Sequence, residues 1–443
     1  MRILLGHKYF FRGGGTSTYL FALMDYLRDH EHVAIPFSVL YDRNEPSEYS
    51  EYFMSPPLGS GASHLKDMRV SPLGALKLLA RATYSTEGRR KVRRLIRDTQ
   101  PDIAYLHNLY NYMSPSPIDE CKAQGLPTVL RVPDYYLLCA ELHLLSRGQV
   151  CRDCVGRSPF GALRRRCLKG SLAATAARCF SMWVHRLLRI YEKVDLFITP
   201  SAFMRGILIE AGYCEDRVIH LPSFYTGAMP QAAPRPEQDF ILYFGRISPE
   251  KGIDTLLRAF ALADPPVRLV LAGSDVDGLR RELERLCGDL GISDRVQFVG
   301  FKVRHELDEL IRDCLFTVVP SRWYDNCPMS VLESFAYGKP VIGSRIGGIP
   351  EQVTDDCGML FEPDDAEGLA RCMTLMLADD ALRARMGEAC RDRLARVYSA
   401  DRHCGRLLHV FRELLAGTPP EQIGREVRED RRTGDETAAA PGE

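Results

Sequence analysis

The amino-acid sequence predicts an α/β protein with two doubly wound parallel-sheet domains, and three observations lead to this prediction. The chain has 443 residues, which favours two domains of roughly 200 residues each over a single core. Short, almost continuously apolar runs alternate with segments of helical periodicity, as in parallel sheets covered by helices on both faces. The alternation stops at a proline-rich stretch and then begins again, so each half of the chain predicts one sheet.

The first domain is placed at residues 1–221. Its strands are expected at residues 2–7, 33–40, 102–108, 127–132 and 195–201. The glycine-rich segment 13–17 follows the first strand and predicts a turn, and the apolar spacing over 18–30 predicts a helix after it.

The second domain repeats this pattern after a linker. Four prolines lie within 217–239, where we predict an interdomain linker at 222–238. The second domain is placed at 239–399, with strands expected at residues 240–246, 267–273, 296–301, 315–321 and 340–344. Residues 400–416 predict a C-terminal helix that packs back on the first domain. Residues 417–443 are charged and poor in apolar side chains, so they predict a disordered tail.

Composition and charge narrow the class of protein. With 45% hydrophobic and 26% charged residues, the chain resembles a soluble globular protein. The apolar N-terminal run continues into the glycine-rich turn and lacks a small-residue cleavage site, so it does not predict a secretion signal. No apolar stretch reaches the roughly 18 residues of a membrane-spanning helix. We therefore expect a cytoplasmic protein, or one at the inner face of the cytoplasmic membrane, and no nucleic-acid partner.

The net charge is zero, but it is unevenly distributed. Residues 1–237 carry +9 and the remainder carries −9. A basic first half predicts an anionic partner, either a membrane surface or a phosphorylated acceptor. The alternative is that two solvated surfaces simply differ in charge.

The segment FGRISPEKG (244–252) is the first candidate site. A strand ends at Phe244, and Arg246 and Lys251 follow in the turn. Ligands of open α/β sheets bind at the carboxyl ends of the strands, where these two cations can hold a diphosphate. A solvated turn is the alternative.

The segment PSRWYDNCPMSVLESF (320–335) is the second candidate site. Asp325 lies in the loop after a strand, and a helix is expected to open at Pro328 with its positive end towards bound phosphate or sugar oxygens. Glu333 lies on this otherwise apolar helix. A buried glutamate needs a partner, which favours a role in binding sugar hydroxyls.

Two further turns follow strands. The segment GGIPE (347–351) allows a backbone to approach a ligand closely. The segment FVGFK (298–302), with Gly300, offers exposed backbone that can recognise a nucleotide base.

Together the segments GRISPEKG, VPSRWYDNCPMSVLESFAYGKPVIGS and GGIPE resemble the donor-binding half of glycosyltransferase family 4, retaining enzymes of the GT-B fold. The resemblance covers nearly the whole chain and is strongest at 240–355. It implies two Rossmann-like domains facing across a cleft, with Arg246 and Lys251 on the donor diphosphate. Asp325 and Glu333 take the places of the family's two glutamates. Glu333 resembles the ribose-binding residue, and Asp325 is one methylene shorter than the glutamate that contacts the donor sugar.

The first domain contributes a second set of candidates. Gly13, Gly14 and Gly15 follow its first strand, and the family has a similar loop that faces the donor phosphates; a plain turn is the alternative. His107 ends the strand at 102–108, where the family often has a histidine near the acceptor and the transferred sugar; a structural histidine is the alternative. The family segment His-Asp-Tyr is Pro133-Asp134-Tyr135 here, so any role of its histidine does not transfer.

The candidates form two sets. The candidate catalytic residues are His107, Arg246, Lys251 and Asp325. The candidate donor-binding residues are Gly14, Gly15, Arg246, Lys251, Gly300, Asp325, Asn326, Cys327, Met329, Ser330 and Glu333.

A cysteine-rich, basic insertion is expected at about 139–193. Cys139, Cys151, Cys154 and Cys167 are spaced C-x11-C-x2-C-x12-C, which is compatible with structural zinc, with reduced free thiols or with a redox role. The basic segment 164–193 predicts an amphipathic helix that either lies on an anionic bilayer or packs on the core.

The resemblance implies a hexosyltransferase that moves a sugar from a nucleotide-diphosphate sugar to a glycan or lipid-linked acceptor with retention. By analogy we expect a role in bacterial surface polysaccharide biosynthesis. The leaving diphosphate is stabilised by cations and a helix dipole, and no cofactor is expected for catalysis. The alternatives are a weakened sugar-nucleotide-binding scaffold and another GT-B enzyme such as an epimerase.

Overall fold

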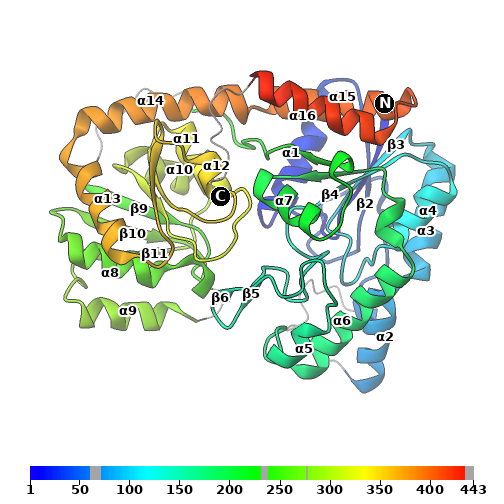
Figure 1. The fold of residues 1–443 in the computed structure, drawn as a ribbon, viewed down its shortest axis with the longest axis horizontal. Coiled ribbons are helices and arrows are strands. Elements are labelled where there is room, and N and C mark those ends of the chain that lie inside the picture. Colours follow the sequence, from blue (N-terminus) through cyan, green and yellow to red (C-terminus); the bar gives the residue numbers. More distant parts are fainter. Residues whose placement is uncertain (60–70, 231–237, 276–277, 435–443) are drawn as a thin grey trace. The chain divides into compact units, whose positions relative to one another are not determined.

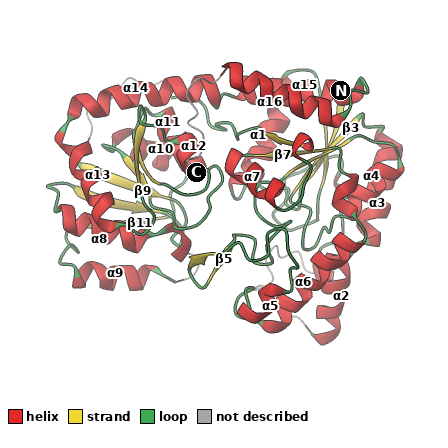
Figure 2. Ribbon diagram, in the orientation of Figure 1, coloured by secondary structure: helices red, strands yellow, loops and turns green. Residues whose placement is uncertain are grey.

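The computed structural model describes residues 1–59, 71–230, 238–275 and 278–434. The chain divides into two compact units. The first unit contains residues 1–146, 151–221 and 404–443, and the second contains 147–150 and 222–403. Each is an α/β unit built on a six-stranded parallel sheet (Figures 1 and 2).

The sheet of the first unit has the strand order β2-β1-β3-β4-β7-β8. Its strands are β1 (Arg2–Gly6), β2 (Val33–Phe37), β3 (Ile103–His107), β4 (Thr128–Arg131), β7 (Leu196–Thr199) and β8 (Val218–His220). Every residue of β3, β4 and β7 is buried, as expected of central strands covered on both faces. β8 lies at the start of the stretch 217–239, where no strand was predicted.

Serine side chains begin several helices of this unit. The helices are α1 (Gly15–Asp29), α2 (Pro72–Thr83), α3 (Thr86–Thr99), α4 (Ser116–Ala123), α5 (Gly161–Arg165), α6 (Leu172–Leu187) and α7 (Ala202–Glu210). Ser71, Ser85, Ser171 and Ser201 precede α2, α3, α6 and α7, and each hydroxyl accepts a hydrogen bond from a free backbone N–H of the first turn. Two short strands, β5 (Leu145–Ser146) and β6 (Gln149–Val150), form a separate ribbon.

The sheet of the second unit has the order β11-β10-β9-β12-β13-β14. Its strands are β9 (Phe240–Phe244), β10 (Arg268–Ala272), β11 (Val296–Gly300), β12 (Thr317–Val319), β13 (Val341–Ser344) and β14 (Gly358–Phe361). β14 was not among the predicted strands. Its helices are α8 (Ile253–Ala263), α9 (Arg280–Asp289), α10 (Arg304–Asp313), α11 (Met329–Ala336), α12 (Ile349–Gln352), α13 (Ala366–Ala378) and α14 (Asp380–Val397).

The continuous apolar run of β9 divides between two cores. Ile241 and Tyr243 pack with residues of α8, α9 and α13. Leu242 and Phe244 point to the other face and pack against α10. Alternating side chains that are all buried require helices on both faces, which is the arrangement that Figure 1 shows for this unit.

In both sheets the first strands are added on one side of the starting strand, and the later strands are added on its other side. In the second unit β9 lies between β10 and β12, and in the first β1 lies between β2 and β3. Open α/β sheets bind ligands at such switch points, beyond the carboxyl ends of the strands. The turns after β9, β12, β1 and β3 therefore carry the candidate sites.

The C-terminal region differs from the predicted tail. Most of α15 (Ala400–Leu415) belongs to the first unit, where Phe411 packs edge-on against Tyr105 at 5.4 Å between ring centroids. α16 (Pro420–Gly434) is a helix, so the prediction of disorder over 417–443 is wrong for that part. Its buried Ile423 and its ion pairs to Asp216 anchor a segment whose composition alone predicts no core. The rest of the predicted tail, 435–443, lies outside the described residues.

The predicted linker also has structure in its described part. Residues 222–230 belong to the second unit, and the Tyr225 N–H donates to the Tyr398 carbonyl at 2.9 Å. Residues 231–237 lie outside the described ranges. Within those ranges, no helix is both long and apolar enough to cross a bilayer.

Candidate active site

The turn after β9 is held against the end of β12. Gly252 adopts φ 64°, and a Cβ atom there would lie 2.0 Å from the carbonyl oxygen of Pro320. Only glycine allows this approach. The Tyr243 hydroxyl donates to the Arg246 carbonyl at 2.6 Å and fixes the other side of the turn. The turn therefore presents Arg246 and Lys251 at the switch point of the sheet.

Lys251 and Asp325 form a direct ion pair. The Lys251 Nζ lies 2.6 Å from Asp325 Oδ2, and both side chains are largely buried. The same ammonium lies 5.5 Å from the centre of the Trp323 ring. The structure thus brings together two predicted residues that are 74 positions apart.

Arg246 is half exposed and pairs with Glu250 at 3.0 Å. Burial acts to raise the pKa of Glu250, but the Ser248 hydroxyl, the backbone and Arg246 together hold it below its usual value. Glu250 was not predicted as a site residue. Its position four residues after Arg246 is the sequence signal that could have found it.

The glycine turn before α12 closes on the Asp325 loop. The Gly348 N–H donates to the Asp325 carbonyl at 2.7 Å. A Cβ atom at Gly347, where φ is 62°, would lie 2.4 Å from the same oxygen. The close approach predicted for this turn is therefore made to the protein's own backbone, and it fixes the loop that carries Asp325.

α11 begins beside this loop with Pro328 as its N-terminal cap residue. Met329 and Ser330 form its first turn, and Asn326 and Cys327 precede it. The Gln352 side-chain amide contacts Cys327 Sγ and the Pro328 carbonyl, each at 3.4 Å. These contacts fix the start of the helix, whose free backbone N–H groups are suited to an anionic oxygen.

Glu333 on α11 has the partner that its burial requires. Its Oε1 accepts from Arg304 Nη1 at 2.8 Å. Arg304, at the start of α10, also donates to the Tyr225 hydroxyl at 2.9 Å and pairs with Asp308 at 2.9 Å. Burial raises the pKa of Glu333, and Arg304 opposes the rise. The sequence indicated that Glu333 needs a partner but did not identify Arg304.

Gly300 ends β11 with φ 71°, and space within 4 Å of its Cβ position is empty of protein atoms. Its carbonyl accepts from the Gly273 N–H at 2.8 Å, which aligns the ends of β10 and β11. The predicted base-recognition turn therefore has an open side, next to the exposed Phe301.

Gly14 and Gly15 lie in the first unit, at the start of α1. Gly14 has φ 139° and caps the helix, and Gly15 is its first residue. The Ser17 hydroxyl donates to the Gly14 carbonyl at 3.1 Å and accepts from the Gly13 N–H at 3.2 Å. These contacts give the glycine turn a defined shape after β1.

His107 ends β3 and is almost fully buried. Its ring packs edge-on against Tyr105 at 4.3 Å and lies 6.2 Å from His7, between ring centroids. Asn108, at φ 48°, joins the cluster through its side-chain amide, 3.2 Å from His7 Nε2. Burial lowers the pKa of His7 to about 4, so this histidine is neutral near pH 7.

Lys8 and Asp134 are two further functional candidates. Lys8 was missed by the sequence analysis, which gave Asp134 no role. They follow β1 and β4. Burial lowers the pKa of Lys8 to about 8, although Asp134 opposes the effect. Asp134 accepts from the Tyr110 hydroxyl at 3.1 Å, and Lys8 Nζ lies 3.7 Å from the centre of the Tyr110 ring. A half-buried lysine with a pKa near 8 can bind an anion or exchange a proton.

The cysteine-rich insertion contains the four cysteines for which zinc binding was considered. Within the described ranges, no group of three or more His, Cys, Asp or Glu side chains is placed to hold an ion. Cys139, Cys151, Cys154 and Cys167 are free thiols. Burial raises the pKa of Cys139 and of Cys154 to about 11, and Cys154 packs with Cys179 in a small apolar cluster. Structural zinc, reduced thiols and a redox role therefore all stay predictions for this insertion.

Residues 228–393, which contain every second-unit candidate above, match the family model described as "Glycosyl transferases group 1". Residues 228–393 form a glycosyl transferases group 1 domain. The ion-paired Lys251 and Asp325, the Arg246 turn and Glu333 all belong to this group 1 domain.

Curated relatives match less than half of the chain. A D-inositol 3-phosphate glycosyltransferase of Salinispora tropica is 34% identical over 193 residues, which is 41% of this chain and 40% of the relative. The lipopolysaccharide core biosynthesis glycosyltransferase LpsE of Rhizobium meliloti is 33% identical over 184 residues, 40% of this chain and 50% of the relative. The chain thus spans about half the length of the curated relatives it matches, or less.

Solved structures match over both units. A sucrose-phosphate synthase from Thermosynechococcus elongatus has a TM-score of 0.65 at 20% identity, covering 94% of this chain and 99% of that one. Anabaena HepE in complex with UDP has a TM-score of 0.60 at 17% identity, covering 98% and 100%. At this identity the match concerns the fold alone, which is the GT-B fold of glycosyltransferases.

Proposed function

We propose that the whole chain is a retaining hexosyltransferase of family 4, which moves a sugar from a nucleotide-diphosphate sugar to a glycan or lipid-linked acceptor. The observation that carries this is the turn after β9. It sets Lys251 beside Asp325 and carries Arg246 at the same switch point of the sheet. Two cations and the N-terminus of α11 can stabilise the charge that develops on a leaving diphosphate.

The Lys251–Asp325 ion pair suggests how the donor binds. A diphosphate that approaches the turn competes with Asp325 for the Lys251 ammonium. The carboxylate is then free to accept from a sugar hydroxyl, the role that its alignment with the family glutamate implies. Glu333, held by Arg304, is placed to accept from the ribose hydroxyls. Retention follows if the acceptor attacks from the face that the diphosphate leaves.

Two observations outside the group 1 domain support a role for the first unit in this reaction. His107 lies at the end of β3, and Lys8 and Asp134 lie at the ends of neighbouring strands. We assign this edge to the acceptor. The basic first half of the chain is suited to a phosphorylated or lipid-linked acceptor, such as one used in bacterial surface polysaccharide assembly at the inner face of the cytoplasmic membrane.

The test is a thermal-shift panel with UDP, GDP, ADP and their sugar conjugates. A ligand that binds the folded protein at 100 times its Kd adds about 2.7 kcal/mol of stability, so the true donor raises Tm. We expect one nucleotide family to do so in the wild type and not in Arg246→Ala. Arg396→Ala is the control, because Arg396 also pairs with an acid four residues away, Asp392, and this pair is exposed.

Transfer is then measured with the identified donor and an acceptor mixture. Donor consumption that depends on acceptor supports the enzyme. A shift without any consumption favours the alternative, a sugar-nucleotide-binding scaffold, and no shift with any nucleotide contradicts both.

A further inference from the structure

α6 presents an apolar face to solvent. Leu172, Phe180, Trp183 and Leu187 are all exposed, Leu187 at 65%. Their spacing places them on one side of the helix. Phe180 and Trp183 are neighbours, with ring centroids 6.1 Å apart. Most surface helices show the reverse, with polar residues outward.

The buried face of α6 mixes polar side chains with the apolar Cys179 and Met182, which pack in a small hydrophobic cluster. The Arg178 guanidinium donates to the Tyr136 carbonyl at 2.7 Å. The Ser181 and Thr83 hydroxyls are 2.8 Å apart, and His185 Nε2 lies 2.7 Å from the Thr83 carbonyl. Hydrogen bonds and the packing of Cys179 and Met182 hold the helix to the first unit. Its exposed apolar residues are therefore not needed for that attachment.

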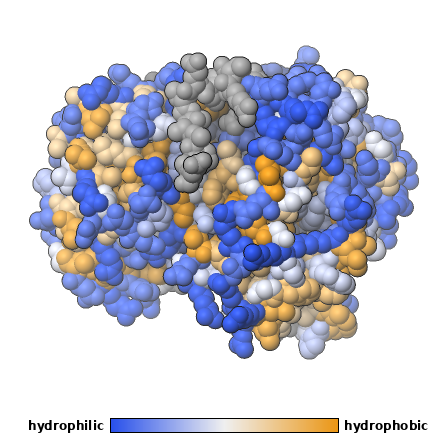
Figure 3. Space-filling view, in the orientation of Figure 1, coloured by the Kyte–Doolittle hydropathy of each residue, from blue (hydrophilic) through white to orange (hydrophobic). Residues whose placement is uncertain are grey.

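α2 extends the same apolar surface. Leu73 and Leu76 are 63% and 62% exposed, and α2 packs along α6. Figure 3 shows hydrophobic side chains gathered in this part of the first unit, around the position of α5 and α6 in Figure 1. We call the six residues Leu73, Leu76, Leu172, Phe180, Trp183 and Leu187 the α2–α6 face. A contiguous apolar face of this kind marks an interaction site.

The surroundings of the α2–α6 face are strongly basic. Residues 157–193 contain nine Lys and Arg residues and one acidic residue, Glu192. Arg164, Arg166 and Lys169 are exposed just before α6 begins, and Lys77 is exposed beside Leu76. A partner that complements the charge of this surface is therefore anionic.

We propose that the α2–α6 face docks on an anionic phospholipid bilayer. Leucine, phenylalanine and tryptophan side chains enter the interfacial layer, where amphipathic aromatic rings are favoured. The flanking lysines and arginines contact the headgroups, each strengthening binding roughly fivefold. The first unit is then a peripheral membrane module. This inference does not depend on the proposed sugar transfer, because no residue of the face belongs to the candidate active site.

The test is co-sedimentation of the full chain with vesicles of phosphatidylcholine alone and of phosphatidylcholine mixed with phosphatidylglycerol. We expect binding to the mixed vesicles only, weakened by salt. Phe180→Ser/Trp183→Ser should lower the vesicle partition coefficient by tenfold or more. Arg164→Gln/Arg166→Gln/Lys169→Gln should lower it by about 100-fold. Because the chain has two tryptophans and Trp323 is buried in the second unit, a blue shift of fluorescence on binding should come from Trp183.

The matched control is Leu262→Ser/Leu375→Ser, which removes two exposed leucines of the second unit and should leave partition unchanged. Circular dichroism and Tm of all variants should equal those of the wild type, which excludes unfolding. Equal binding to neutral and anionic vesicles, no binding to either, or a self-association that the Phe180/Trp183 variant abolishes would each overturn the proposal. Donor binding in the thermal-shift panel should be the same in all these variants, so this failure is distinct from failure of the proposed function.

Discussion

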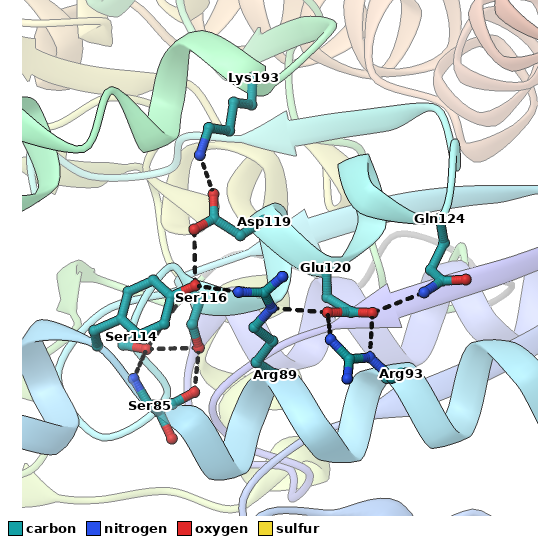
Figure 4. A network of polar contacts seen from close by, with 10 residues as sticks. Ser85, Arg89, Arg93, Ser114, Ser116, Asp119, Glu120, Gln124 and Lys193 are labelled. Carbon is teal, nitrogen blue, oxygen red and sulfur yellow. Dashed lines mark hydrogen bonds and ion pairs between the residues drawn. The ribbon is translucent and has the colours of Figure 1, made fainter.

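Two buried carboxylates in this molecule are paired with cations in different ways. Glu120 on α4 is fully buried. It accepts hydrogen bonds from Arg89, from Nε and Nη2 of Arg93, and from Gln124 (Figure 4). Asp325 has one cation, Lys251, at one oxygen. Glu120 joins α3 to α4 within the first unit and has no exchangeable partner. Asp325 lies at the switch point of the second sheet, where a ligand can replace it.

The difference teaches how to separate a structural ion pair from a functional one. Replacing one partner of Glu120 leaves the other hydrogen-bond donors in place, so no single partner is essential for holding the carboxylate. The Lys251–Asp325 pair is held by the backbone of two glycine turns instead, which fix the loops and leave the two charged groups with a single ion pair between them. A group that must release its partner for a substrate cannot be fixed by several hydrogen bonds.

The largest effect is expected when Glu120 loses both arginines. Arg89→Met/Arg93→Met leaves a buried carboxylate without a cation, which typically lowers the free energy of unfolding by about 3–5 kcal/mol. Chemical denaturation at pH 7 measures this. Arg94→Met is the control, because Arg94 forms an exposed pair with Glu51, and little change is expected. A double variant as stable as the control would show that the network is not structural.

The pH dependence of the same variant gives a second check. In the wild type, burial acts to raise the pKa of Glu120, but the hydrogen bonds from Arg93, Arg89 and Gln124 lower it to about 2. Stability from this group is therefore present above its ordinary pKa of 4.5 and is lost as pH falls towards 2. In the double variant only the Gln124 hydrogen bond still opposes burial, which is the larger effect. The pKa of Glu120 should therefore rise above 4.5, and acidification should stabilise the fold relative to pH 7.

The next largest effect is on catalysis, and it tests the other member of the comparison. Lys251→Met should lower kcat/KM by about 100- to 1000-fold, the range seen when one charge-stabilising donor is removed, while the fold remains intact. Steady-state kinetics with the donor identified above measure this. Arg396→Ala should keep wild-type kinetics. If Lys251→Met loses stability but keeps kcat/KM, the Lys251–Asp325 pair is structural after all.

A smaller effect, on nucleotide binding, is expected at Glu333. This carboxylate is intermediate between Glu120 and Asp325, because Arg304 binds one of its oxygens. Glu333→Gln should weaken the ribonucleotide about 10- to 100-fold, as expected for loss of charged hydrogen bonds. It should leave binding of the 2′,3′-dideoxy analogue unchanged. Calorimetric titration of both nucleotides on both proteins separates the outcomes. Equal weakening of the two ligands would mean that Glu333 supports the helix and does not contact ribose.

The local sequence pattern was sufficient to predict much of the secondary structure of this molecule. The five strands predicted in each half all exist, because buried parallel strands are continuous apolar runs. The spacing around Arg246, Lys251 and Asp325 also placed those side chains at strand ends. β8 and β14 were missed. β8 has only three residues, Val218–His220, next to prolines, and β14 begins with a glycine and is only partly buried as an edge strand.

Contacts between distant residues could not be predicted. Nothing in the local sequence pairs Arg304 with Glu333 or brings the charges of Lys8 and Asp134 near each other. Both relations depend on the order of strands in the sheets. The outward apolar face of α6 is equally hidden. Its amphipathic pattern was visible over 164–193, but periodicity does not say which side faces the core, and here polar Arg178, Ser181 and His185 do.

The smallest effect is expected at α16, where a half-buried carboxylate extends the comparison. Asp216 pairs with Arg425 and Arg428 of α16, and Gly424 lies so close that a Cβ atom there would be 1.8 Å from the Asp216 carbonyl oxygen. Alanine normally stabilises a helix relative to glycine by about 1 kcal/mol, yet Gly424→Ala must displace α16 and break these pairs. Gly405→Ala on α15 is the matched control, because space within 4 Å of its Cβ position is free, and it should raise stability slightly. Hydrogen exchange should show lost protection in α16 alone for Gly424→Ala. Unchanged protection there would mean that the ion pairs to Asp216 hold the helix even when its close backbone approach is removed. A half-buried pair could then act as the Glu120 network does.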